Sequence, residues 1–179
     1  MNNDRPTTGA HAAATIGTMA TPSSSSAANS SPAWDATRVP VLESEIADVV
    51  FEVLVSVMWS DGELASGDVE RGRAAADLMC VRSKRGGALG AIANGPLPFP
   101  TVPFEQLDAY GRRLAYAGAC WIDTASEHPS ERRTSFIRAV RMKLDLEDSA
   151  VSELRAVAEV VHTRYPVPRD GMAALMRNV

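Results

Sequence analysis

Apolar residues dominate positions 41–60, a stretch that is longer than an ordinary strand. Polar side chains recur within it every four residues, at Asp48, Glu52, Ser56 and Ser60. Many of the apolar residues are β-branched, which leaves a strand as the alternative. The four-residue polar row favours a helix, because it forms a single stripe along one. A helix that is apolar around most of its circumference is expected at the centre of a bundle.

The same helical spacing continues along the chain. A second helix is predicted at 67–82, and three more are predicted at 107–121, 136–144 and 151–161, each with apolar residues three or four positions apart. Residues 166–179 are interpreted as a C-terminal tail or a short helix that packs on the others. The predicted fold class is therefore all-α, a compact bundle of about five to seven helices.

Residues 1–33 differ in composition from the rest of the chain. Most of them are Ala, Ser, Thr, Asn, Pro or Gly, which bury too little apolar surface to offset the entropy of ordering them. We interpret 1–33 as a disordered low-complexity tail, since it lacks the basic and hydrophobic regions of a signal peptide. The helical domain is predicted at 34–165. Glycines and prolines make 83–103 a surface connection, with room for a short helix at 88–93.

Charge and cysteine content exclude several classes of protein. The net charge of −4 argues against a general nucleic-acid binder. No apolar run approaches the roughly 20 residues of a membrane span. The two cysteines, Cys80 and Cys120, exclude a disulfide scaffold and a zinc site built on cysteine pairs. Both fall on apolar helix faces, so we expect buried free thiols.

Two short motifs recur in the same order in the two halves of the chain. Trp-x-Asp occurs at 59–61 and again at 121–123. A Glu-Arg pair follows at 70–71 and, with nearly the same separation, at 131–132. In both copies an apolar helix runs into the Trp, a polar turn follows, and a second helix begins near the Glu. The pattern predicts two related helix–turn–helix halves, with each Glu in the first turn of its helix.

Residues 59–64, with the sequence Trp-Ser-Asp-Gly-Glu-Leu and Glu70 beyond them, resemble the corner of the TerB-like domain of tellurite-resistance proteins. Residues 119–123 and 130–131 resemble the same corner more loosely. The resemblance spans roughly residues 41–162. It implies a compact domain of about seven helices, an acidic divalent-cation site, and association with stress-response or membrane-linked assemblies.

The resemblance also implies the ligands of such a cation. Carried over position by position, they are Asp61, Glu63, Glu70, Asp123 and Glu131. Oxygen ligands alone suit hard cations such as Ca²⁺, Mg²⁺ or Mn²⁺. The second copy departs from the family, because Thr and Ala at 124–125 stand where the family has Gly and Glu.

Charge distribution offers support for a cation and also an alternative to it. Residues 34–80 carry a net charge of −7 and residues 81–179 a net charge of +3, so the first corner attracts cations. In the alternative, the acids cap a helix and face water. Arg71 and Arg132 would then pair with a corner aspartate and remove the need for a metal.

Three functional hypotheses follow from these patterns. The first is a non-enzymatic TerB-like interaction module in the cytoplasm, which binds partner proteins in a tellurite, metal or oxyanion stress response and holds a divalent cation at its acidic corner. The second is a structural or adaptor protein that binds a partner without an ion. The third is a metal-dependent hydrolase, which would need a pocket and a general base with a shifted pKa. No phosphate-binding loop or nucleophile elbow is present in the sequence.

Overall fold

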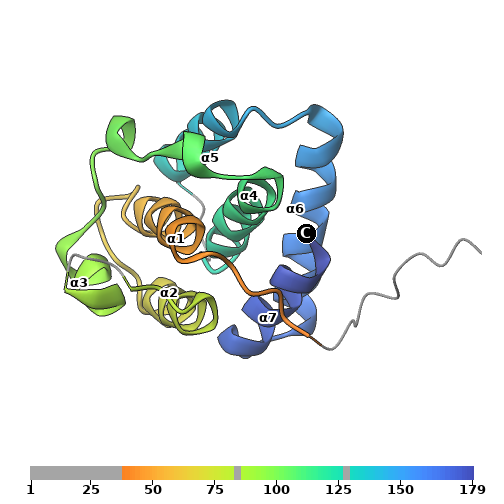
Figure 1. Cartoon of the computed structure of the whole chain (residues 1–179), viewed down its shortest axis with the longest axis horizontal. Helices are drawn as coiled ribbons and strands as arrows, with labels where there is room; N and C mark the ends of the chain where they lie inside the picture. Colours follow the sequence, from red (N-terminus) through yellow and green to blue (C-terminus); the bar gives the residue numbers. More distant parts are fainter. Residues whose placement is uncertain (1–37, 83–85, 127–129) are drawn as a thin grey trace, which may run out of the picture. The chain divides into compact units, whose positions relative to one another are not determined.

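The computed structural model describes residues 38–82, 86–126 and 130–179 (Figure 1). The tail predicted at 1–33 lies outside the described residues. Seven α-helices and two short 3-10 helices form the described part of the chain. They are α1 (Ser44–Met58), α2 (Ser66–Met79), α3 (Gly87–Asn94), η1 (Phe99–Thr101), η2 (Phe104–Gln106), α4 (Ala109–Asp123), α5 (Glu131–Leu144), α6 (Asp148–Arg164) and α7 (Pro168–Asn178).

The described fold is all-α, as predicted, and the two 3-10 helices add to the five to seven helices expected. Residues 41–60 contain a helix rather than a strand. None of the helices in the described part of the chain has the length and apolar character that a membrane crossing requires.

Helices α1 and α4 form the centre of the bundle. Every residue from Val49 to Met58 is buried, and so is every residue from Leu114 to Ile122. The two helices approach closely at Gly118, where an added Cβ would lie 2.7 Å from Cδ2 of Leu54. The central position predicted for the first helix is confirmed, because neighbouring helices cover nearly all of its sides.

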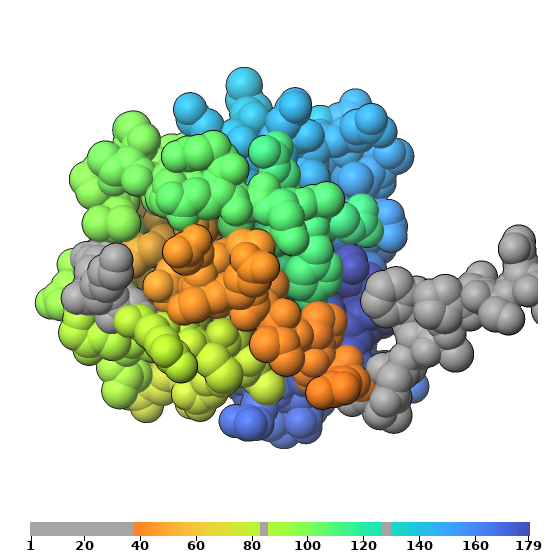
Figure 2. All heavy atoms as spheres, viewed as in Figure 1, coloured from red at the N-terminus to blue at the C-terminus, as the bar shows by residue number. Residues whose placement is uncertain are grey.

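The remaining helices surround this pair. Helix α6 packs on α4, and α7 packs on α2 and α6, as Figure 1 shows. Helix α3 and η2 both contact α1. In the space-filling view they lie beside it, so α1 shows only part of its surface on this face (Figure 2). Three residues of α7, Met172, Leu175 and Met176, are fully or almost fully buried.

The two helix–turn–helix halves have the same dimensions. Helices α1 and α4 each have 15 residues, and α2 and α5 each have 14. The connections between the helices, 59–65 and 124–130, are also equal in length. One constant offset, the one that relates Ser44 to Ala109, therefore relates all four helix boundaries of the first half to those of the second.

Individual hydrogen bonds repeat at the same offset. The bond from Trp59 N to Val55 O recurs as the bond from Thr124 N to Cys120 O. The left-handed residues that end α2 and α5, Cys80 and Asp145, are also related by this offset. The predicted halves are thus confirmed.

The alignment of the halves that the motifs predict is wrong by about one helical turn. Trp59 follows the last residue of α1, whereas Trp121 lies inside α4. Glu70 is the fifth residue of α2 and Glu131 the first residue of α5, so only Glu131 lies in a first turn as predicted. The first turn of α2 carries Asp68 instead. The motif match aligned side chains of the same type, whereas the backbone capping positions set the repeat.

Two smaller expectations also need correction. Cys80 is exposed rather than buried, because it ends α2 in the left-handed conformation, while Cys120 is buried as expected. The short helix considered at 88–93 is present as α3, but the connection predicted at the surface also contributes the buried side chain of Val102 to the core.

Candidate functional site

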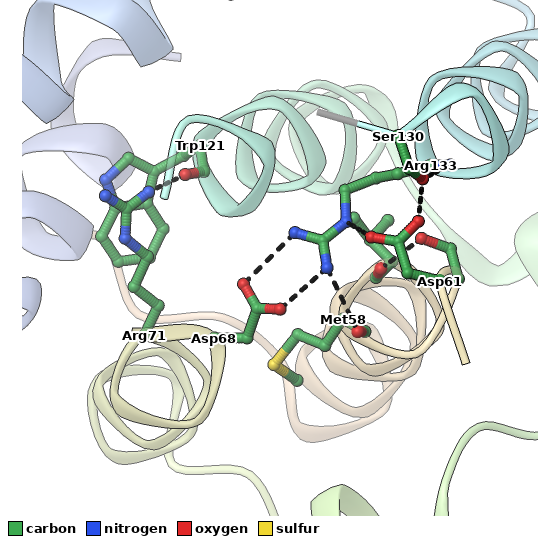
Figure 3. A network of polar contacts seen from close by, with 9 residues as sticks. Met58, Asp61, Asp68, Arg71, Trp121, Ser130 and Arg133 are labelled. Atoms are coloured by element: carbon green, nitrogen blue, oxygen red, sulfur yellow. Dashed lines mark hydrogen bonds and ion pairs between the residues drawn. The ribbon is translucent and has the colours of Figure 1, made fainter. Parts of the chain in front are cut away.

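The two inter-helix turns lie side by side and are joined by an arginine from α5. Ser130 caps α5, and its side-chain oxygen accepts a hydrogen bond from the backbone N–H of Arg133 at 3.1 Å. This cap fixes the first turn of α5, and Arg133 is its third residue. The side chain of Arg133 is only 3% exposed and extends toward the first half of the chain (Figure 3).

Arg133 forms ion pairs with two aspartates of the first half. Its Nη2 lies 2.8 Å from Oδ2 of Asp68, and its Nε lies 2.9 Å from Oδ2 of Asp61. Nη2 also donates to the carbonyl oxygen of Met58, the last residue of α1, at 3.4 Å. The Ser130 hydroxyl donates to Oδ1 of Asp61 (Figure 3). Asp68 is 1% exposed, so Arg133 is the counterion of a fully buried carboxylate.

The charge on Arg133 is strongly favoured. Burial lowers the pKa of Arg133, but the hydrogen bond to Asp68 and the negative charges of Asp68, Asp61 and Asp123 outweigh it and raise that pKa above its ordinary value. The guanidinium therefore stays protonated throughout the physiological range.

Arg71 of α2 reaches in the opposite direction, toward the second half. Its Nη1 donates to the carbonyl oxygen of Trp121 and, at 3.0 Å, to the hydroxyl of Thr124. Its Nη2 lies 2.7 Å from Nδ1 of His162. Its guanidinium lies over the Trp121 ring, at 4.6 Å from the centroid (Figure 3). Burial lowers the pKa of Arg71 to about 10, with the negative charge of Asp68 opposing the shift. Arg71 is thus held mainly by neutral acceptors and a ring.

Asp123, the last residue of α4, contributes to a shallow cleft between α4, α5 and α6. The cleft holds about 230 Å³, and Cys120 of α4 and Arg155 and Glu159 of α6 are among its lining residues. Oδ1 of Asp123 is buried without a hydrogen-bond partner in the described part of the chain. Burial raises the pKa of Asp123, although the charges of Arg133 and Arg155 oppose the shift. Burial likewise raises the pKa of the Cys120 thiol, to about 11, so it is not a reactive thiolate at neutral pH.

The five predicted cation ligands do not gather in one place. Asp61 is paired with Arg133, and Asp123 lies at the cleft. The other three, Glu63, Glu70 and Glu131, are exposed on the 59–65 turn, α2 and α5 respectively. Within the described ranges, no three His, Cys, Asp or Glu side chains are arranged to hold a metal ion. The divalent cation stays a prediction.

The predicted neutralisation by arginine occurs, but through a different residue. Arg133 pairs with the corner aspartates, whereas the predicted Arg132 is exposed and Arg71 binds the other corner. Sequence reasoning missed the roles of Ser130, Arg133 and His162. Ser130, a favourable N-cap residue, could have located the start of α5, but no pattern marked Arg133 as buried.

A second surface feature lies on α6. Glu153, Val157, Val160 and Arg164 border a shallow hollow of about 350 Å³, which also touches Tyr165. Val160 is 58% exposed and Val157 is half-buried. This α6 stripe, Glu153-Val157-Val160-Arg164, is an apolar strip with an acid at one end and a base at the other.

Comparisons with known proteins identify no relative. No family model and no curated protein matches the sequence, and no solved structure matches the fold. The resemblance to the TerB-like domain therefore rests on the residues of the two corners alone.

Proposed function

We propose that the chain is a non-enzymatic protein-interaction module that binds a helix of a protein partner on its α6 stripe. The observation that carries the proposal is the solvent-accessible apolar hollow beside Val157 and Val160, with charged residues at its two ends. Apolar surface rimmed by charge is typical of protein interfaces. A helix that lies in such a groove contacts it with side chains three and four positions apart.

Other exposed apolar side chains support this choice of surface by contrast. Val41, Leu89, Met142 and Val167 are each more than half exposed. They lie on different segments, and single exposed apolar residues are ordinary on a protein surface. On α6 two valines share one hollow, so a partner can bury both at once.

The ion pairs that Arg133 forms at the corner favour a module that works without a bound cation. Arg133 supplies the positive charge that Asp61 and Asp68 require, so the acidic corner braces the two halves. This favours the second sequence hypothesis, an adaptor with no cation, over the first. The TerB-like assignment, the tellurite-type stress response and the cytoplasmic location stay predictions.

Site-specific photo-crosslinking in the organism that encodes the chain tests the proposal. A photo-reactive amino acid at Val160 should give a discrete protein adduct, and the same amino acid at Met142 of α5, which is 77% exposed, should not. The Val160 adduct should also disappear when Val157 is replaced by Glu. Equal labelling from both positions, or none from Val160, would refute the proposal.

A further inference from the structure

The order of residues along α6 makes the stripe complementary to itself. With about 100° of rotation per residue, Glu153, Val157, Val160 and Arg164 fall within an arc of about 60° on one side of the helix. Their spacing of four, three and four residues is that of side chains that meet a second helix.

We infer that the partner of the α6 stripe is a second copy of this chain, packed with its α6 antiparallel across a two-fold axis; the inference rests on the proposed function of that surface. In an antiparallel pair centred between residues 158 and 159, each residue faces one whose number makes a constant sum with its own. Val157 of one copy then faces Val160 of the other, and Glu153 faces Arg164. A two-fold interface needs such a self-complementary patch.

Charge selects this arrangement over the parallel one. An antiparallel pair gives two Glu–Arg contacts, one on each side of the valines. A parallel pair would place Glu153 beside Glu153 and Arg164 beside Arg164, and like charges in contact disfavour an interface. Antiparallel helices also align their dipoles favourably.

The surroundings of the stripe are compatible with this contact. Glu153 already pairs with Arg113 of α4 at 3.1 Å, but its side chain remains 59% exposed and its carboxylate has capacity for a second donor. Arg164 is exposed, and its guanidinium lies 5.9 Å from the Tyr165 ring centroid. The contact is one helix wide and its ion pairs stay near water, so we expect a reversible dimer.

Sedimentation velocity of the purified full chain, from low micromolar to millimolar concentration, tests the inference. The wild type should shift from monomer to dimer within this range. Val160→Glu should abolish the dimer, while Met142→Glu, the control at an exposed apolar residue of α5, should leave it unchanged. Circular dichroism of each variant confirms that it is folded.

A charge-reversal pair tests the antiparallel register. A parallel pair has two like-charge contacts in the wild type and in each variant, so only the antiparallel pair is weakened by a single substitution. Arg164→Glu and Glu153→Arg should each weaken self-association by about tenfold, because each puts two like-charge contacts into the symmetric interface. Mixing the two variants should restore association, since every contact between them is again of opposite charge. No rescue on mixing would exclude this register.

The inference and the proposed function can fail separately. A chain that stays monomeric at every concentration, while photo-crosslinking from Val160 still gives an adduct with a different protein, overturns the second copy and leaves the proposed function. If the Val160→Glu variant forms the dimer as readily as the wild type does, the inference that the stripe is the dimer interface is also overturned. A monomeric chain that gives no adduct from Val160 overturns both.

Discussion

The two buried arginines hold the two halves together by different physical means. Arg133 lies between two aspartates, one of them fully buried, and its charge is compensated by charge. Arg71 donates to a carbonyl, a hydroxyl and an imidazole and lies on an indole ring, with no ion pair among the described residues. Both reach from the second helix of one half to a carbonyl near the end of the first helix of the other. The two arginines join the halves in a similar way from positions that the repeat does not relate, and they do so with different energetics.

Arg133→Met should give the largest loss of stability. The substitution leaves the carboxylate of Asp68, which is 1% exposed, buried without a counterion. Removal of one partner of a buried ion pair costs about 3–5 kcal/mol of unfolding free energy. Urea denaturation measures this loss. The neighbouring Arg132→Met, at an exposed position, should change the free energy by no more than about 0.5 kcal/mol.

Arg71→Met should cost less, about 1–2 kcal/mol, because it leaves no charge unpaired. The carbonyl oxygen of Trp121 would still accept from the hydroxyl of Thr124 at 2.8 Å. The methionine side chain would still pack on the indole ring. The same urea denaturation compares the two arginines directly. Equal losses for Arg71→Met and Arg133→Met would contradict the distinction drawn between them.

The stability that the contacts around Arg71 provide should decrease in mild acid, because His162 becomes protonated. Burial, and then the positive charge of Arg71, lowers the pKa of His162 below its ordinary value of 6.5. The unfolded chain therefore binds this proton more readily than the native protein. The contribution of His162 to the free energy of unfolding is therefore complete above pH 6.5, and it is lost as the pH drops through the pKa of His162 in the native protein. Protonation also removes the acceptor that Nδ1 offers to Arg71.

His162→Gln measures this small effect by difference. Thermal unfolding of the wild type and of the variant is measured from neutral pH to about pH 5. The difference in stability between the two proteins should isolate the titration of the histidine from that of the carboxylates. The difference should shrink in an Arg71→Met background, because the neighbouring charge is then gone. A wild type and a variant with parallel pH profiles would show that His162 does not contribute.

The smallest expected effect is that of divalent cations. Because Arg133 already compensates Asp61 and Asp68, chelation and addition of Ca²⁺, Mg²⁺ or Mn²⁺ should leave the melting temperature unchanged. A bound ion at about 100 times its Kd would add about 2.7 kcal/mol, which is easily detected. A shift that is lost in Asp61→Asn/Glu70→Gln would restore the predicted cation site.

Periodicity predicted the fold well because helix and core depend on the same apolar spacing. Residues 49–58 are buried on all sides, as a helix with one narrow polar row suggests, although Glu52 and Ser56 of that row are themselves buried. The register of the repeat was harder to predict. Trp59 and Trp121 are the same residue type in similar contexts, but only Trp121 lies within its helix.

The site was predicted in outline only. A corner that brings acid and arginine together could be inferred from the sequence, but the identity of the arginine could not. Arg132 and Arg133 are adjacent, and the phase of α5 decides which of them faces the core. That phase is set by the Ser130 cap. Arginine is also usually exposed, so burial of Arg133 depends on tertiary contacts that no local pattern reveals.

The packing of α7 on α2 has a consequence for synthesis of the protein. Residues 80–167 separate the two helices in the chain. At roughly 5–20 residues per second, a ribosome needs about 4–18 s to make that intervening length. During this time α2 lacks its contact with α7, whose side chains Met172, Leu175 and Met176 are buried in the folded protein. A nascent chain paused before α7 therefore presents an uncovered apolar surface to chaperones.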